Sequence, residues 1–471
     1  MHLSELLFAV CCFIPVSLWA ESPSDPKPNL IVIMADDLGY ADVGFNGCVD
    51  IPTPHIDSIA SRGVKCTSGY VAYAVCGPSR AGFITGRYPQ RFGFERNPQY
   101  KPDDPQMGLP LSEQTIADVL KTAGYRSGVV GKWHLGANSI HHPLERGFDE
   151  FYGHLGGGHR YLPQDLTIQK SEQAKNESES YRTWIVNNRT PEKPTKYLTD
   201  DFSDAAVRFV ENNQSHPFFL FLSYNAPHLP LQATADYLER VSQIEDPKRR
   251  TYAAMISAVD DGVGRVLAKV HELGLDDRTI VFFLSDNGGP HLKNASRNEP
   301  LRGGKGDVWE GGFRVPFAVS WPSHLPANTI YDQPVSALDI MATIVDLSGA
   351  TVRPDFPLDG VNLVPFLSGE NSESPHEAIY LRKFDQQRFA VRQGDYKLVI
   401  SMKDSKPKLY NLSDDIQEQD DLKFKNPEQL AEMERLRQDW ASELMDPVFL
   451  GLIHTENYQK KKQKKQKRQK K

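Results

Sequence analysis

Short runs of apolar residues alternate along the chain with longer amphipathic segments. Four of the runs are rich in β-branched and aromatic side chains, as expected of buried strands, and they cover residues 29–37, 127–130, 217–223 and 279–289. Residues 111–123 and 252–273 favour helices, and the second segment repeats its apolar side chains at a three- to four-residue spacing: Met255, Val259, Val263, Val266 and Val270. This alternation predicts an α/β fold in which helices cover both faces of a large, mixed, mostly parallel sheet.

The pattern changes after residue 375. The stretches "RFAVRQGDYKLVI" (388–400) and "KPKLYNLSDD" (406–415) are typical of a small antiparallel sheet, and a helix is expected near residues 427–444. We therefore expect a large domain over residues 27–375 and a smaller C-terminal α+β domain over residues 376–455.

Both ends of the chain differ in composition from these domains. Residues 6–20 form an apolar run, and Ala20 precedes the polar "ESPSDPKP", which predicts a cleaved signal peptide over residues 1–20 and a secreted or periplasmic protein. Glu5 and the absence of an early Lys or Arg leave a retained N-terminal anchor as the alternative. Residues 456–471 read as a disordered basic tail, suited to electrostatic contact with an anionic polymer or surface.

Charge is distributed unevenly. The formal net charge is −7, yet residues 460–471 carry nine positive charges, so the rest of the chain is strongly acidic. Nothing in the sequence is typical of a folded nucleic-acid-binding module, and we expect no nucleic-acid partner.

Three cysteines remain if the signal peptide is removed: Cys48, Cys66 and Cys76. Exported proteins tend to pair their thiols, and an odd number leaves one thiol to explain. Either Cys76 pairs with a neighbour, or Cys48 pairs with Cys66 and leaves Cys76 for chemistry.

Polar side chains follow two of the predicted strands. Asp36 and Asp37 end the first, and Asp286 and Asn287 end the run at 279–289. If these strands are neighbours in the sheet, four oxygen donors meet at one edge, as a hard cation such as Ca²⁺ or Mg²⁺ requires. The alternative is that these residues only cap the following helices or turns.

The segment "AVCGPSRAGFITGR" (74–87) combines a cysteine with a predicted helix start. Pro78 favours a first helical turn, so the backbone N–H groups of residues 79–81, together with Arg80, can cradle an anion. A nucleophile at Cys76 would lie against that cradle. A catalytic cysteine of low pKa is one interpretation, but no nearby segment supplies its usual histidine base.

Seven motifs in order resemble the type I, formylglycine-dependent sulfatases, of the arylsulfatase and N-acetylgalactosamine-sulfatase kind. "CGPSR" followed by "TGR" matches the family signature, with Ile84 in place of the usual leucine. The other six stretches are "MADDLGYADVG" (34–44), "GKWHLG" (131–136), "GFDEFYG" (147–153), "NAPHLP" (225–230), "SDNGG" (285–289) and "LRGGKGDVWEGGFRVP" (301–316).

The resemblance implies the alkaline-phosphatase-like sulfatase fold and a role for each matching residue. A maturation enzyme would oxidise Cys76 to formylglycine, whose hydrate supplies the nucleophile. Asp36, Asp37, Asp286 and Asn287 match the ligands of one Ca²⁺, with Mg²⁺ as the less favoured ion. Arg80 would hold the hydrate and the carboxylates, Lys132 and His134 match the pair beside the nucleophile, and His228 and Lys305 match the groups that contact sulfate and protonate the leaving oxygen.

The resemblance leaves the substrate open. His159 is the candidate for a further sulfate contact, although the glycines before it make its alignment ambiguous. Selectivity for an aryl or carbohydrate sulfate must come from loops around residues 90–110, 154–175 and 229–250. A phosphoryl-transferring enzyme of the same fold and an inactive glycan-binding protein are the competing hypotheses; the oxygen-only ligands and the intact motifs argue against them.

Overall fold

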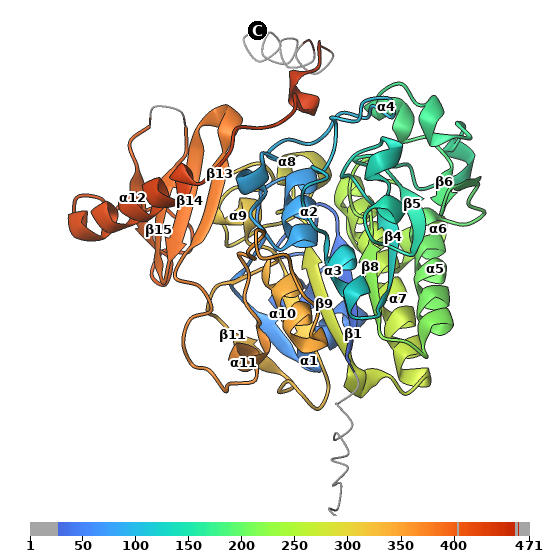
Figure 1. Ribbon diagram of the computed structural model, residues 1–471, viewed down its shortest axis with the longest axis horizontal. Coiled ribbons are helices and arrows are strands. Elements are labelled where there is room, and N and C mark those ends of the chain that lie inside the picture. The colour runs from blue at the N-terminus through green and yellow to red at the C-terminus, as the bar shows by residue number, and fades with distance from the viewer. Residues whose placement is uncertain (1–26, 403–404, 457–459, 461–471) are drawn as a thin grey trace, which may run out of the picture.

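The computed structural model describes residues 27–402, 405–456 and 460, so the predicted signal peptide and most of the basic tail lie outside the described residues. Within these ranges no helix is long and apolar enough to cross a bilayer. A ten-stranded sheet forms the centre of the molecule (Figure 1). Its strand order is β11 (Thr329–Tyr331), β2 (Val64–Cys66), β10 (Phe317–Ser320), β9 (Thr279–Ser285), β1 (Asn29–Ala35), β8 (Phe218–Ser223), β4 (Arg126–Lys132), β5 (Glu150–His154), β6 (Ile185–Asn187) and β7 (Thr190–Glu192).

The middle of this sheet is parallel, as predicted. Strands β9, β1, β8, β4 and β5 run in one direction, whereas β10, β6 and β7 pair antiparallel with their neighbours. Strand β1 shows why its sequence is continuously apolar: Leu30, Val32 and Met34 enter one hydrophobic core, and Ile31 and Ile33 enter the core on the other face. Both faces of the strand are therefore buried.

Helices cover both faces of the sheet, which confirms the expected layers. One face carries α1 (Pro54–Ser61), α5 (Leu198–Asn213), α6 (Ala235–Arg240) and α7 (Pro247–Glu272). The other carries α2 (Cys76–Thr85), α3 (Ile116–Thr122) and α10 (Asp339–Ser348). The remaining short helices are α4 (Glu177–Ser180), α8 (His291–Asn294), α9 (Glu310–Phe313) and α11 (Val364–Leu367), and strands β3 (Gly69–Tyr70) and β12 (Val335–Ser336) form a separate pair.

Two helix boundaries differ from the sequence prediction. Helix α3 begins at Ile116 instead of near residue 111, because Thr115 and Asp118 form a capping box that fixes its first turn. Helix α7 begins earlier than residue 252, at Pro247, where the Asp246 side chain accepts a hydrogen bond from Arg249 N. In both cases a polar cap, and not the apolar periodicity, sets the boundary.

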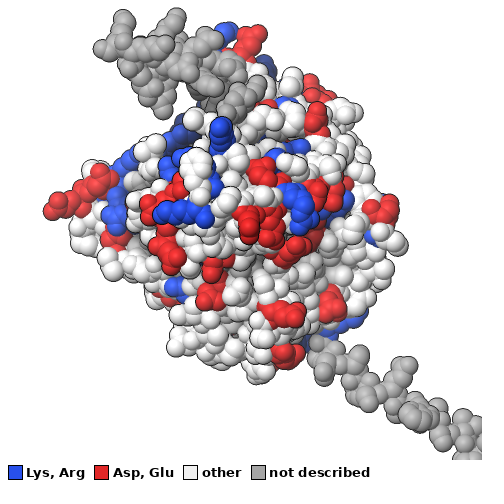
Figure 2. Space-filling model, turned by 90° about the vertical axis from the view of Figure 1, so that its left-hand side faces the viewer, with Lys and Arg blue, Asp and Glu red and all other residues white. Residues whose placement is uncertain are grey.

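A four-stranded antiparallel sheet follows the large domain, as expected. Its strands are β13 (Ile379–Lys383), β14 (Arg388–Gln393), β15 (Tyr396–Ile400) and β16 (Lys408–Asn411), and α12 (Pro427–Ser442) packs on its outer face, at the left in Figure 1. The inner face joins the large core through Leu381, Ala390 and Val399. On the side of the molecule that Figure 2 shows, Lys and Arg groups are intermixed with Asp and Glu.

A buried ion network joins the small antiparallel sheet to the rest of the chain. Lys397 Nζ, on β15, lies 2.8 Å from Glu310 Oε1 and 2.7 Å from Glu418 Oε1, and all three side chains are fully buried. The neighbouring Arg302 donates to Glu418 O at 2.6 Å. The small sheet is thus tied to the segment 301–316, which contains the predicted site residue Lys305.

The pairing of Cys48 with Cys66, one of the two alternatives left open by the sequence, is not present, because all three described cysteines have free thiols. Cys66 is buried in the core on β2, whereas Cys48 lies in a loop and its Sγ is 3.2 Å from Asp50 Oδ1. The alternative pairing of Cys76 with a neighbour is excluded in the same way.

Candidate active site

The acidic residues predicted to bind a metal lie together at the carboxyl ends of two neighbouring strands. Strands β1 and β9 are parallel and in register up to the pair Ala35 and Ser285, so the residues that follow them emerge side by side. Ligand atoms of Asp36, Asp37, Asp286 and Cys76 all lie within 4.8 Å of one another, and the four side chains are buried. The sheet topology therefore brings together the groups that the sequence left as two separate pairs.

Asn287 joins this cluster through its side-chain amide. Its Nδ2 donates to Asp37 Oδ1 at 2.7 Å and to Gly288 O at 3.1 Å, which fixes the orientation of the amide. The remaining atom, Oδ1, is buried and has no hydrogen-bond partner among the described residues. A buried acceptor without a partner beside three carboxylates fits a hard divalent cation, which prefers oxygen ligands.

A basic side chain contacts each of the three carboxylates. Lys132 Nζ lies 2.5 Å from Asp36 Oδ2, Lys305 Nζ lies 2.5 Å from Asp37 Oδ1, and Arg80 Nε lies 2.9 Å from Asp286 Oδ2. Such pairing lets charged groups remain buried, because an isolated buried charge is costly.

The three carboxyl groups do not ionise equally easily. Burial and the charge of Asp286 raise the pKa of Asp36 to about 7. Burial also opposes ionisation of Asp37, but Lys305 and His228 outweigh it and lower the pKa of Asp37 to about 2. A divalent cation would favour the ionised form of Asp36.

Cys76 is the first residue of α2, as the sequence predicted for the start of a helix. Gly77 N donates to Asn97 Oδ1 at 2.8 Å, which satisfies one free N–H of the first turn. Cys76 Sγ lies 2.8 Å from Lys305 Nζ and 3.6 Å from Asp36 Oδ1. Burial raises the pKa of the thiol to about 12, so the unmodified side chain is protonated and does not fit the interpretation as a low-pKa catalytic cysteine.

Arg80 connects α2 with three strand ends. Besides its contact with Asp286 after β9, it donates to Ser223 Oγ at the end of β8 and to Lys132 O at the end of β4, the latter at 3.2 Å. Ser223 Oγ in turn donates to Lys132 O at 2.7 Å. Ser223 was not identified from the sequence; its position as the last residue of a buried strand was the available signal.

The two predicted histidines are buried and neutral. Burial lowers the pKa of His134 well below its usual value and that of His228 to about 3. His228 Nδ1 lies 2.7 Å from Leu229 O, which can only accept, so Nδ1 carries the proton; Nε2 lies 3.7 Å from Asp37 Oδ2. His134 has a positive φ of 59° and an Nδ1 atom without a partner in the described part of the chain. Strained backbone of this kind is often found at functional sites.

His159 lies apart from these contacts. Its ring packs on His154 with a centroid separation of 4.8 Å, its Nδ1 is 2.8 Å from Arg160 O, and its Nε2 is 3.5 Å from Thr183 Oγ1. Within the described residues it makes no hydrogen bond to Cys76 or to the four oxygen ligands. Its predicted contact with sulfate stays a prediction.

The glycine segment at residues 156–158 connects His134 with Glu177. A Cβ atom on Gly157 would lie 2.7 Å from His134 Nε2 and 2.8 Å from Glu177 Oε1, so only glycine permits this close approach. Glu177 Oε1 accepts a hydrogen bond from Gly157 N at 3.1 Å. Glu177 belongs to no motif in the sequence, and its contact with Gly157 joins two loop positions that no periodicity connects.

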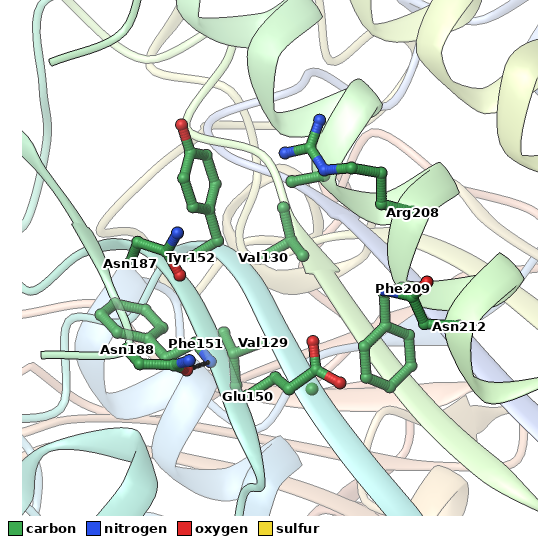
Figure 3. A pocket seen from close by; sticks show the side chains of 12 residues that line it. Val129, Val130, Glu150, Phe151, Tyr152, Asn187, Asn188, Arg208, Phe209 and Asn212 are labelled. Atoms are coloured by element: carbon green, nitrogen blue, oxygen red, sulfur yellow. Dashed lines mark hydrogen bonds between the residues drawn. The ribbon is translucent and has the colours of Figure 1, made fainter. Parts of the chain in front are cut away.

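A cavity of about 200 Å³ lies elsewhere, against the middle of β4 and β5 (Figure 3). Glu150, Tyr152 and Arg208 are among its lining residues. None of the predicted site residues lines it, so it is separate from the cluster at the strand ends.

Comparison with known protein families identifies the models that this chain matches. The family model described as Sulfatase matches residues 28–350, which is most of the chain. The chain belongs to the sulfatase family. A second model, described as N-sulphoglucosamine sulphohydrolase, C-terminal, matches residues 304–445 and so includes the small antiparallel sheet.

Curated relatives of this chain include sulfatases from animals. The N-acetylgalactosamine-6-sulfatase of Mus musculus is 33% identical over 386 residues, covering 79% of this chain and 71% of the relative. The arylsulfatase of Hemicentrotus pulcherrimus is 35% identical over 385 residues, covering 79% and 67%. This sulfatase is therefore a sulfuric ester hydrolase, as the motif resemblance implied.

Solved sulfatase structures share the fold. The structure described as Ps i-CgsB in complex with k-i-k-neocarrahexaose is 40% identical, with a TM-score of 0.85 over 90% of this chain and 95% of the other. The PsFucS1 sulfatase from Pseudoalteromonas sp. is 25% identical, with a TM-score of 0.74 over 89% and 91%. The expected fold, a large mixed sheet between helices with a small C-terminal antiparallel sheet, is confirmed.

Proposed function

We propose that this sulfatase removes sulfate from a sulfated polysaccharide outside the cytoplasm, with formylglycine at position 76 as nucleophile and Ca²⁺ held by Asp36, Asp37, Asp286 and Asn287. The observation that carries the proposal is the contact of Lys305 Nζ with both Cys76 Sγ and Asp37 Oδ1. It places the side chain of residue 76 beside the oxygen cluster and beside a cation suited to sulfate.

The choice of a polysaccharide rests on the relatives. The structure most similar in fold among those named above was solved with a neocarrahexaose, and another relative acts on N-acetylgalactosamine 6-sulfate by its name. The extracytoplasmic location rests on the apolar run at residues 6–20.

Formylglycine explains why a thiol of high pKa occupies the nucleophile position. The aldehyde takes up water to form a geminal diol; one hydroxyl oxygen attacks sulfur, the bond from sulfur to the ester oxygen breaks, and the alcohol leaves with a proton. The second hydroxyl then gives up its proton, the bond from Cβ to the sulfated oxygen breaks, and the aldehyde returns as sulfate departs. A formylglycine-generating enzyme of the host is the partner needed for maturation.

The side chains near residue 76 are suited to different steps of this reaction. Lys305 contacts the side chain of residue 76 directly, so its ammonium group can hold a sulfate oxygen and supply a proton to the leaving oxygen. His228 Nε2 faces the same carboxylate as Lys305, and an anionic sulfate between them favours the protonated imidazole that can share this role. His134, whose buried Nδ1 has no partner among the described residues, is the candidate acceptor for the proton of the second hydroxyl.

Arg80 and Lys132 complete the proposal. Both side chains are fully buried. Arg80 contacts Asp286 and Lys132 contacts Asp36, so each basic group positions one carboxylate. When bound, Ca²⁺ would neutralise negative charge on the sulfate and on the attacking oxygen.

The test is to produce the full chain with a formylglycine-generating enzyme and to analyse the peptide containing residue 76 by mass spectrometry. Turnover of 4-nitrophenyl sulfate and 4-nitrophenyl phosphate is measured on the same material. We expect formylglycine at position 76 and a preference for the sulfate ester. Active protein with an unmodified Cys76 in every molecule, or a preference for phosphate, would overturn the proposal.

A further inference from the structure

A hollow of about 470 Å³ lies next to the cluster of Asp36, Asp37, Asp286, Asn287 and Cys76, which is called the catalytic cluster below. Three segments that are distant in sequence form its walls: residues 99–101, residues 175–181 around α4, and the C-terminal segment at Leu452 and Thr455. In Figure 1 α4 lies at the top of the molecule, the end at which the carboxyl ends of the central strands carry the catalytic residues. No family motif covers these three segments.

The hollow and the catalytic cluster share a wall. Glu177 lines the hollow and also contacts Gly157, which lies against His134. Tyr181 lines it too, and the Tyr181 ring lies 6.4 Å from the ring of His228. Only the side chains of Glu177 and Tyr181 therefore separate a ligand bound in the hollow from a ligand group that contacts His134 and His228.

The charges that line the hollow favour an anion. Lys101 and Lys175 are exposed, and neither ammonium group has a carboxylate partner among the residues that the structure describes. Glu177 is the one acidic residue of the described lining, and burial raises its pKa to about 7. Two unpaired cations in a concave site attract a second negative group on the substrate.

The other lining groups suit a sugar ring. Tyr181 is half-buried with its hydroxyl against Gly158, so part of the side chain faces the hollow, and Asn176 adds an amide. An aromatic face with nearby polar groups is a surface on which a sugar can stack while its hydroxyls are hydrogen-bonded.

Hydrogen bonds hold the C-terminal wall in place. Leu452 N donates to Asn97 O at 2.9 Å, Gln99 Nε2 donates to Leu450 O at 2.6 Å, and Arg96 Nη1 donates to Phe449 O at 2.8 Å. The wall is thus fixed before a ligand arrives, which lowers the entropic cost of binding.

We propose that this hollow is a subsite for the neighbouring sulfated sugar of an oligosaccharide substrate, with Lys101 and Lys175 holding its sulfate. The inference rests on the proposed function, since it assumes that the sugar losing its sulfate lies at Cys76. It makes a chain with sulfate on adjacent sugars the preferred substrate over an isolated sulfated sugar.

The test measures binding without turnover. In the full chain carrying Cys76→Ala, isothermal calorimetry gives the Kd for sulfated hexasaccharides from carrageenan and chondroitin sulfate, for their desulfated forms, and for a monosulfated monosaccharide. We expect at least one sulfated hexasaccharide to bind. Adding Lys101→Ala and Lys175→Ala should weaken that binding about tenfold, and raising the salt concentration should reduce the difference.

Matched variants separate the subsite from a general loss of charge. Lys121→Ala removes an exposed cation on α3, outside the lining, and should leave every Kd unchanged. Lys101→Arg together with Lys175→Arg should retain most of the affinity, and the monosaccharide should bind all variants alike.

The subsite is overturned if no sulfated hexasaccharide binds, if the double alanine variant binds it as the parent does, or if the monosaccharide loses as much affinity as the hexasaccharide. The proposed function is judged separately, from turnover of 4-nitrophenyl sulfate by matured protein. If that reaction fails, the binding measurements still test the subsite independently.

Discussion

Lys305 Nζ lies 2.8 Å from Cys76 Sγ and 2.5 Å from Asp37 Oδ1. One cation therefore contacts both the predicted nucleophile position and a predicted oxygen ligand of the metal. Lys305→Ala should lower kcat for 4-nitrophenyl sulfate by about 10²–10³-fold, the usual loss when a preorganised charge beside the reacting atoms is removed. The measurement is steady-state kinetics at saturating calcium, with Lys248→Ala, an exposed lysine of α7, as the control. Unchanged kcat in the Lys305 variant would contradict the assigned role.

Replacing the nucleophile should separate the two halves of the reaction. Cys76→Ser provides one hydroxyl that can attack sulfur but lacks the second hydroxyl that expels sulfate. We expect the variant to gain the mass of one sulfate group on residue 76 and to stop after one turnover. Intact-mass spectrometry after incubation with 4-nitrophenyl sulfate checks this, and continued turnover would show that the second hydroxyl is not needed.

Removing divalent cations should abolish turnover and lower the Tm. The cause is the three buried carboxylates and the unpartnered Asn287 Oδ1, which lose their common ligand. At a calcium concentration one hundred times Kd, the bound ion should stabilise the fold by about 2.7 kcal/mol. Thermal scans after chelation and after adding back Ca²⁺ or Mg²⁺ give the result.

Asp37→Asn should reduce that calcium-dependent shift in Tm, whereas Asp236→Asn, an exposed position on α6, should not. A calcium response that is equal in both variants would place the ion elsewhere.

Breaking the ion network between the domains should destabilise the protein. Lys397→Met leaves Glu310 and Glu418 buried without their shared cation, which should cost about 3–5 kcal/mol of unfolding free energy. Urea unfolding compares this variant with Lys425→Met, an exposed lysine that precedes α12. Equal stabilities of the two variants would show that the network contributes little.

His376 should make stability depend on pH. Its Nε2 lies 2.9 and 3.0 Å from the two carboxylate oxygens of Asp339, and although burial opposes protonation, Asp339 raises the pKa of His376 above its usual value. The folded state therefore binds the proton more tightly than the unfolded state. The resulting stabilisation is present below a pH of about 6.5, the pKa of unfolded histidine, and is lost as the pH rises through the folded-state pKa.

His376→Gln should accordingly cost about 1–3 kcal/mol at low pH and less at high pH. Urea unfolding across this range checks the trend, with the exposed His216→Gln as control. A loss that grows with pH would reverse the assigned sign.

The sequence was sufficient to predict the layers of the fold and the two polar pairs that follow β1 and β9. Strand β1 is apolar at every position because both of its faces are buried, and that pattern is visible without a structure. Asp36 and Asp286 could be joined only on the condition that β1 and β9 are neighbours, because strand order depends on packing among all the strands. Once that order is given, both pairs meet as predicted.

Other contacts of the site had no local signal. Ser223 holds Arg80 because β8 lies between β1 and β4, and Glu177 reaches Gly157 from a loop that no periodicity describes. The possible pairing of Cys48 with Cys66 does not occur, because cysteine number says nothing about where each side chain packs: Cys66 lies in the core on one face of the central sheet, and Cys48 packs against the core on the other face.

Residues from the C-terminal part of the chain hold the segment that contains Lys305. Lys383 Nζ, on β13, donates to Gly306 O, and Arg302 donates to Glu418 O. A chimaera with the C-terminal sheet of another sulfatase would lack the Lys383 contact with Gly306. The segment that contains Lys305 would then be held by different side chains. Changes in the C-terminal part of the chain should therefore alter the support of the segment that carries Lys305.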